Sequence, residues 1–167
     1  PKIAMTEQAP WATADLCDAH GEDVQVLDGG FANYGGVASF SGPLTTLAVD
    51  NDNTLVRTAL EEPGQGRVLV VAGHGSITCA LLGGNLGALA AANNWAGVVV
   101  DGCVRDLDEL ATHAVGVRAR GACPRRSVKA GKGQRDVAVK IGEITLTPGM
   151  FLYADADGLV AAQKALL

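Results

Sequence analysis

The segment from Asp101 to Asp106 carries the residue types best suited to chemistry. It reads Asp-Gly-Cys-Val-Arg-Asp and follows an apolar stretch, residues 98–100, that predicts a strand. In open α/β sheets, ligands gather beyond the carboxyl ends of strands. Asp106 could hold a hard divalent cation there, and Arg105 could grip a substrate carboxylate with its planar guanidinium. A structural alternative stays open: Asp106 and Glu109 have the spacing of a helix capping box, and Arg105 could pair with a nearby acid.

A second candidate site precedes this segment, at the predicted start of a helix. It is the run Gly83, Gly84, Asn85 and Leu86. A helix N-terminus exposes backbone N–H groups and carries the positive end of the helix dipole, so it attracts anions. A carboxylate or a phosphate group would fit there. In the structural alternative, the glycine pair allows close packing and Asn85 is an ordinary N-cap.

Three other features point to chemistries that the sequence disfavours. Gly73-His74-Gly75-Ser76 begins like a dinucleotide-binding fingerprint, but Thr78 stands where the third glycine belongs, so a tight turn from strand to helix is favoured. Cys103 and Ser76 have no obvious histidine partner in the sequence, which disfavours nucleophilic catalysis. The four cysteines and three histidines are scattered. This scatter disfavours a zinc site and indicates thiols rather than disulfides.

The elements that must position these residues alternate between strand and helix in the first two-thirds of the chain. Apolar runs, capping residues and prolines predict strands at 44–49, 67–72, 98–100 and 115–119, and helices at 13–20, 54–62, 86–93 and 106–113. The last third is β-rich, with strands at 137–141, 144–146, 151–153 and 159–161 and a closing helix at 163–167. We therefore expect one α/β domain over residues 1–167, with layered sheets and helices.

Composition excludes several classes of protein. The net charge of −5 argues against a dedicated nucleic-acid binder, because phosphate contacts need clustered cations. No apolar run approaches the roughly 18–20 residues of a membrane span. Residues 1–7 do not have the long apolar stretch of a signal peptide. A cytoplasmic protein with no direct contact to membrane or nucleic acid is the expectation.

Positive charge is concentrated in one part of the chain. Between Arg118 and Lys140 lie eight of the 13 basic residues and one acid, Asp136, so this segment has a charge of +7 and the remainder −12. A solvated loop is the favoured interpretation. The alternative is a patch that attracts anionic ligands or an acidic protein surface.

Several short motifs, in their order and spacing, resemble the RraA-like family. That family is named for the regulator of ribonuclease E activity and also includes metal-dependent 4-hydroxy-4-methyl-2-oxoglutarate aldolases. The similarity covers nearly the whole chain, from about Thr13 to Ala161. The matching stretches are TADLCD (13–18), FANYGG (31–36), SFSGP (39–43), NWAGVVV (94–100), GCVRD (102–106), LYAD (152–155) and DG (157–158).

The resemblance implies a layered β/β/α fold like that of the swivelling domains, and a homotrimer with active sites near the subunit boundaries. It implies that Arg105 binds substrate, that Asp106 binds Mg²⁺ or Mn²⁺, and that the backbone of residues 83–86 binds substrate. The aldolase pattern is an Asp, then twenty residues, then the Arg-Asp pair. In this chain that position is Gly84.

Two functions follow from these observations. In the leading hypothesis, the protein is a divalent-metal-dependent carbon–carbon lyase that releases pyruvate from small 2-oxo acids, 4-hydroxy-4-methyl-2-oxoglutarate and oxaloacetate. The alternative is a non-catalytic regulator that binds and inhibits ribonuclease E or a related RNA-processing enzyme. The Arg105–Asp106 pair favours the enzyme, and Gly84 favours the regulator. A third possibility is a family member that has lost both roles.

Overall fold

One large sheet organises residues 10–167, the part of the chain that the computed structural model describes. Residues 1–7, for which we expect no signal peptide, lie outside the described residues. The strands of the sheet are β1 (Val24–Val26), β2 (Ala32–Asn33), β3 (Phe40–Ala48), β4 (Val68–Leu82), β5 (Gly97–Val104), β6 (Gly116–Ala122), β7 (Gln134–Arg135), β10 (Phe151–Asp155) and β11 (Gly158–Ala162). Their order is β1-β11-β10-β3-β4-β5-β6-β2, with β7 also paired to β3. A separate hairpin is made of β8 (Val139–Ile141) and β9 (Ile144–Leu146).

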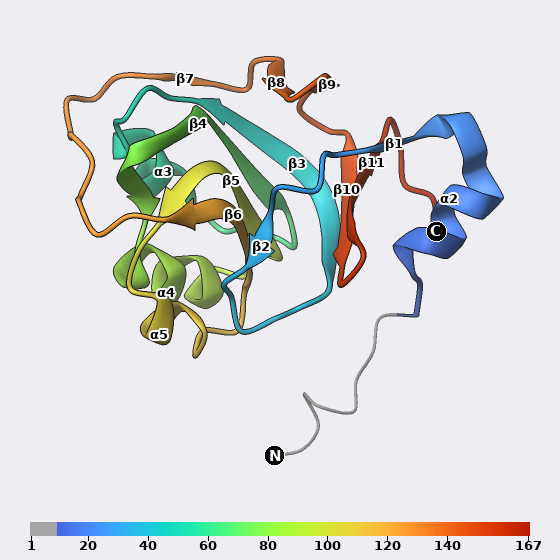
Figure 1. The fold of residues 1–167 in the computed structure, drawn as a ribbon, viewed down its shortest axis with the longest axis horizontal. Coiled ribbons are helices and arrows are strands. Elements are labelled where there is room, and N and C mark those ends of the chain that lie inside the picture. The colour runs from blue at the N-terminus through green and yellow to red at the C-terminus, as the bar shows by residue number, and fades with distance from the viewer. Residues whose placement is uncertain (1–9) are drawn as a thin grey trace.

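Within residues 10–167 the helices are short. They are α2 (Thr13–His20), the 3₁₀ turn η1 (Gly21–Asp23), α3 (Thr54–Leu60), α4 (Gly84–Ala92) and α5 (Leu107–Leu110). Figure 1 shows α3, α4 and α5 beside the parallel strands, whereas α2 lies at the other end of the molecule, beyond β10 and β11. Within residues 10–167, no helix has the length and apolar character needed to cross a membrane.

The centre of the sheet is parallel and buried on both faces. Strands β3, β4, β5 and β6 pair in parallel. Side chains alternate along a strand, so Leu69 and Val71 pack on the face covered by α3, α4 and α5. Val68 and Val70 pack on the opposite face, with the β8–β9 hairpin and strands β10 and β11. This double burial explains the continuous apolar runs of the sequence and confirms the layered α/β prediction.

Strand β3 joins the parallel centre to an antiparallel edge. Its first half, residues 40–43, pairs antiparallel with β10, and its second half, residues 44–48, pairs parallel with β4. A side chain on Gly42 would overlap the carbonyl oxygen of Gly66, so the chain needs a glycine where the strand changes partners. The sequence predicts only the second half, because Ser41, Gly42 and Pro43 are poor strand formers.

The largest difference from prediction is the length of β4. A tight turn from strand to helix is predicted at 73–76, but the strand continues through this segment to Leu82. The segment forms an irregular stretch with register shifts against β5, and His74 and Gly75 have φ angles of 61° and 66°. Glycines accommodate such backbone angles without strain, so here they mark bulges inside a strand.

Smaller differences occur at the two ends of the chain. The predicted helix at 163–167 is wrong, because these residues form only a bend and an irregular tail. Thr13 is not the N-cap of α2. Ala12 occupies that position, while the amide and hydroxyl of Thr13 donate to the carboxylate of Asp155 at 2.8 and 2.6 Å. Strands β1, β2 and β7 were not predicted.

Candidate active site

Arg105 and Asp106 lie at the carboxyl end of β5, where the sequence predicts them. Asp106 adopts a left-handed conformation, with φ 59° and ψ 49°, at the start of α5. Aspartate tolerates this conformation better than most residues. The turn directs the carboxylate away from its own helix, and Asp106 Oδ2 accepts a hydrogen bond from the amide of Gly84 at 2.9 Å. The capping-box alternative is therefore wrong, since Asp106 makes no side-chain cap to α5.

The N-terminus of α4 meets this turn directly. Gly83 is its N-cap, and the first intrahelical hydrogen bond runs from the Gly87 amide to the Gly83 carbonyl. Asn85 is therefore not the N-cap but lies in the first turn. A helix leaves its first amides without intrahelical acceptors. With the Gly84 amide bound to Asp106, the amides of Asn85 and Leu86 stay available for a ligand.

Neighbouring side chains occupy the space beside both glycines. A Cβ atom on Gly83 would lie 2.8 Å from Asp106 Oδ2 and 3.3 Å from Arg105 Cγ. A Cβ atom on Gly84 would overlap the carboxyl group of Glu109. The close-packing interpretation of the pair is thus supported by the contacts, and it leaves anion binding by the next two amides open.

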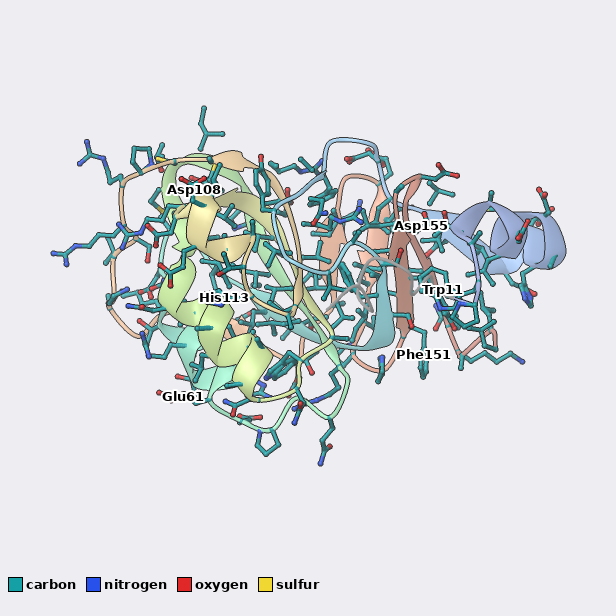
Figure 2. The ribbon with its side chains drawn as sticks, turned by 90° about the horizontal axis from the view of Figure 1, so that it is seen from below. Trp11, Glu61, Asp108, His113, Phe151 and Asp155 are labelled. Carbon is teal, nitrogen blue, oxygen red and sulfur yellow. The ribbon has the colours of Figure 1, made fainter. Side chains whose placement is uncertain are left out.

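Glu109 is a member of this cluster that the sequence prediction missed. Its carboxyl group comes from α5 and occupies the place that a side chain on residue 84 would take. The side chain is half exposed, and its Oε2 atom lies 3.5 Å from His113 Nε2. Figure 2 shows His113 and Asp108 on this side of the molecule. The family resemblance leads us to expect a carboxylate at position 84, and here the carboxyl group of Glu109 lies beside Gly84.

Arg105, Asp106 and the first turn of α4 line one polar cavity of about 150 Å³, whereas Glu109 lies beside Gly84 and is not part of its lining. It contains all six residues predicted to form the site, together with residues from three other segments. The lining residues are Asn53, Arg57, Ala80, Gly83, Gly84, Asn85, Leu86, Arg105, Asp106, Arg126, Ser127 and Lys129. Four of them are basic and one is acidic, so the cavity favours anionic ligands.

Arg105 and Asp106 also line a second cavity of about 280 Å³, with Leu107, Cys123 and Pro124. The Arg105 guanidinium donates to the carbonyl of Pro124 at 3.2 Å. In the part of the chain that the structure describes, Arg105 is in no ion pair with an acid. A larger cavity of about 550 Å³ lies far from this pair, between η1 and the C-terminal segment. Because it contains neither Arg105 nor Asp106, we place the candidate site in the smaller cavities.

The basic segment 118–140 divides into two groups. Arg118, Arg120, Arg135 and Lys140 lie on strands, so the interpretation of a solvated loop is wrong for them. Arg120 binds Asp101 and Asp28, and Arg135 binds Glu62. Arg126 and Lys129, by contrast, lie between the strands and line the polar cavity.

The disfavoured chemistries find no support in the geometry. Gly73-His74-Gly75-Ser76 lies within β4 rather than between a strand and a helix, so it does not form a phosphate-binding turn. The Ser76 hydroxyl donates to Asn51 Oδ1 at 2.6 Å. Cys103 is 2 % exposed, and burial raises the pKa of its thiol, with a smaller effect from Cys123. A buried thiol with a raised pKa is a poor nucleophile.

The donor set of the site suits a hard divalent cation. Asp106 and Glu109 offer carboxylate oxygens, and Mg²⁺ typically binds one or two carboxylates while it keeps several waters. Within residues 10–167 there is no group of three or more His, Cys, Asp or Glu side chains placed to hold a metal. Asp106 and Glu109 are the residues that would hold such an ion, and water and substrate would supply its remaining ligands.

Comparison with known proteins identifies the family. A family model described as Aldolase/RraA matches residues 13–161. A protein of Aromatoleum aromaticum, provisionally named a 4-hydroxy-4-methyl-2-oxoglutarate aldolase, is 52 % identical over 93 % of this chain and 98 % of its own.

Two solved structures have the same fold over nearly their full length. The RNA-processing inhibitor RraA from Thermus thermophilis has a TM-score of 0.92 and 45 % identity, covering 95 % of this chain and 96 % of its own. A Geobacillus kaustophilus protein, described as an S-adenosylmethionine:2-dimethylmenaquinone methyltransferase, has a TM-score of 0.90 and 48 % identity, covering 93 % and 97 %. The match over residues 13–161 and these identities show that the chain belongs to the RraA-like family.

Proposed function

We propose that this protein is a divalent-metal-dependent carbon–carbon lyase that acts on small 2-oxo acids and releases pyruvate. Its proposed reactions are the retro-aldol cleavage of 4-hydroxy-4-methyl-2-oxoglutarate and the decarboxylation of oxaloacetate. The observation that carries the proposal is the convergence of Arg105, Asp106 and the first turn of α4 on one cationic cavity. The names of the relatives support an aldolase in general terms.

Asp106 and Glu109 are the residues that would hold the metal and its waters. A divalent cation supplies Lewis-acid polarisation of the substrate's 2-oxo carbonyl when it is bound. Arg105 adds positive charge where negative charge develops on that oxygen as the carbon–carbon bond breaks. The amides of Asn85 and Leu86 orient the adjacent carboxylate.

Both reactions break the bond between C3 and C4 of the substrate, and they differ in the fragment that leaves. In the retro-aldol reaction, the bond between C3 and C4 breaks, its electron pair forms an enolate on the C1–C3 fragment, and the C4 hydroxyl gives up its proton as C4, C5 and the methyl group leave as a second pyruvate. In decarboxylation the same bond breaks, C4 leaves as carbon dioxide, and no hydroxyl proton is involved. In both reactions a proton from water adds to C3 and converts the enolate to pyruvate. The Glu109 carboxylate lies beside Gly84, which lines the cavity, and would accept the hydroxyl proton through a water. Arg57, Arg126 and Lys129 would attract the C5 carboxylate of 4-hydroxy-4-methyl-2-oxoglutarate, which stays intact when the C3–C4 bond breaks.

A coupled assay for pyruvate tests this function. Wild-type protein is given each substrate with Mg²⁺, with Mn²⁺ or with EDTA, beside Asp106→Ala and the matched control Asp108→Ala on the same helix. We expect metal-dependent turnover that Asp106→Ala lowers by at least about 100-fold, because it loses a metal ligand and the contact to α4. Asp108 is exposed and outside the cavity, so its variant should keep activity. No turnover above background from either substrate would refute the lyase.

A second function is favoured by the similarity to the structure of an RNA-processing inhibitor. In this proposal the protein binds an endoribonuclease of the ribonuclease E type and inhibits it without chemistry at the cavity. Purified ribonuclease is assayed with and without the protein, at low and at high salt. Inhibition that Asp106→Ala leaves intact would support the regulator, and no binding at any salt concentration would exclude it for that partner.

The homotrimer implied by the family resemblance also remains a proposal. Light scattering of the protein as it elutes from a size-exclusion column measures the mass of the assembly directly. A mass three times that of the 17.0 kDa chain is expected. A monomeric mass at working concentration would mean that one chain forms the whole site.

A further inference from the structure

The basic loop, residues 123–133 between β6 and β7, carries Lys129 into the polar cavity without any helix or strand of its own. An exposed loop of this composition would ordinarily sample many conformations. Its backbone is instead tied to residues 51–54, which precede and begin α3. The amide of Val128 donates to the Asn51 carbonyl at 3.0 Å, and the Asn53 amide donates to the Val128 carbonyl at 3.3 Å.

Asp52 is the centre of this attachment. It is 4 % exposed. Its Oδ1 atom accepts the amide and the hydroxyl of Thr54 at 2.9 and 2.7 Å. Its Oδ2 atom accepts the amides of Ala130 and Lys132 in the loop at 2.8 and 3.2 Å. Burial raises the pKa of Asp52, but these hydrogen bonds outweigh it and bring the pKa to about 2.

The side chain of Lys129 lies between these tied positions. Its Nζ atom donates to Asn53 Oδ1 at 2.9 Å, and the Asn53 amide group donates to the Leu81 carbonyl at 3.3 Å. Backbone on both sides of Lys129 is thus fixed by residues 51–53, and its ammonium group is fixed by Asn53. Without the Asp52 contacts, the loop would lose two of its backbone attachments and Lys129 would gain rotational freedom.

We propose that Asp52 is a positioning residue that holds the basic loop so that Lys129 presents its ammonium group in the cavity beside Arg105 and Asp106. Asp52 itself does not line that cavity. It acts through the loop backbone, as a carboxylate that gathers amides from two segments. The positioning stands on these contacts alone, whereas the ligand that Lys129 meets rests on the proposed function.

Chemical labelling of the Lys129 amine tests the positioning without any ligand. A short pulse of an amine-acetylating reagent, followed by mass spectrometry, is applied to wild type, Asp52→Asn and Asp155→Asn. Asp155 is the matched control, because it accepts the amide and the hydroxyl of Thr13 in the same way but holds α2 at the other end. Lys129, Lys140 and Lys164 are all exposed, so the reagent reaches each of them, and Lys140 and Lys164 serve as internal references.

We expect Asp52→Asn to raise the labelling rate of Lys129 by about tenfold, the size of one lost hydrogen bond to a charged group. The rates of Lys140 and Lys164 should not change, and Asp155→Asn should leave all three rates unchanged. Equal labelling of Lys129 in wild type and Asp52→Asn would overturn the proposal. If Asp52→Asn does not fold, Thr54→Val removes one donor to Asp52 and should raise the labelling of Lys129 by a smaller factor.

A double-mutant cycle connects the positioning to ligand binding. Oxalate, a planar dianion shaped like the enolate of pyruvate, is titrated with Mg²⁺ into wild type, Asp52→Asn, Lys129→Met and the double variant. We expect each single change to weaken binding about tenfold and the double variant to bind no worse than Lys129→Met, because Asp52 acts through Lys129. Multiplied losses of about 100-fold would show that Asp52 acts independently of Lys129. If wild type binds no oxalate, the proposed function fails, and the labelling experiment still decides the positioning.

Discussion

Asp52 and Asp155 make the same kind of contact at opposite ends of the molecule. Asp52 accepts the amide and hydroxyl of Thr54 and two amides of the basic loop. Asp155 accepts the amide and hydroxyl of Thr13 and the amide of Asp157. At both carboxylates burial raises the pKa, and the hydrogen bonds lower it by more, so each pKa lies below its ordinary value.

The two contacts differ in what they hold. Asp155 joins α2 to the turn between β10 and β11, beside the edge-to-face pair of Trp11 and Tyr153. Figure 2 shows Asp155 and Trp11 together, far from His113 and Asp108. Asp52 instead joins the loop that carries Lys129 to the wall of the polar cavity. The same kind of hydrogen-bonded carboxylate therefore holds a helix at the α2 end of the molecule and a loop of the candidate site at the other end.

Replacing Glu109 with alanine tests the cavity end of the molecule and has the largest expected effect of the changes that compare the two ends. Turnover of 4-hydroxy-4-methyl-2-oxoglutarate should fall by about 100-fold, because a positioned acid or base contributes roughly 10²–10⁴ in rate. The melting temperature should stay within about 2 °C, since exposed substitutions rarely change stability by more than about 0.5 kcal/mol.

The double variant Glu109→Ala/Gly84→Asp sharpens this prediction. A side chain on residue 84 points into the space that the Glu109 carboxyl group leaves. Part of the turnover should return, because the carboxylate comes back on α4 instead of α5. If the neighbouring control Asp108→Ala lowered turnover by the same factor, the loss in Glu109→Ala would not depend on the position of its carboxyl group beside Gly84.

Replacing Asp155 with alanine tests the other end and should affect only stability. Loss of a capping contact of this kind costs about 1–2 kcal/mol. For a chain of this length, that lowers the melting temperature by roughly 2–8 °C, as calorimetry would measure. The KM for oxaloacetate should not change. A raised KM in a variant that is still fully folded would break the comparison, because it would couple the far end to the site.

Acid should weaken the contacts of both carboxylates. Each pKa is lowered in the folded state, so each carboxylate stabilises the protein above its ordinary pKa of about 3.9 and loses that contribution as the pH falls through the folded value. For Asp52 the loss extends to about pH 2. Urea unfolding between pH 6 and pH 2 should show a shallower loss of stability in Asp52→Asn and in Asp155→Asn than in wild type. A pH dependence identical to that of wild type in either variant would contradict the assignment for that residue.

The smallest expected effect concerns a cation at the cavity. Arg126→Ala should raise the KM for oxaloacetate about two- to fivefold at low salt and less at high salt, because exposed charges are screened. Arg125→Ala is the matched control, since Arg125 is exposed, carries the same charge and does not line the cavity. Equal changes in both variants would indicate general attraction of the anion rather than a contact at the site.

Prediction from sequence succeeds where the signal is local. The predicted strands at 67–72, 98–100 and 115–119 overlap β4, β5 and β6, because a strand buried on both faces is rich in apolar residues. The two-residue strands β2 and β7 have no such run and exist only because β6 and β3 offer them partners. The second half of β4 was missed because glycine and polar residues hide a bulged strand.

The sequence by itself determined which residues could do chemistry here: Arg105 and Asp106 directly after a strand, and a glycine pair at the start of a helix. Only the tertiary structure decided that Glu109 occupies the space beside Gly84 and that Lys129 reaches Asn53, 76 positions away. Periodicity and spacing report which face of an element is buried. Contacts between distant segments depend on how strands, helices and loops pack, and no short pattern in the chain encodes that arrangement.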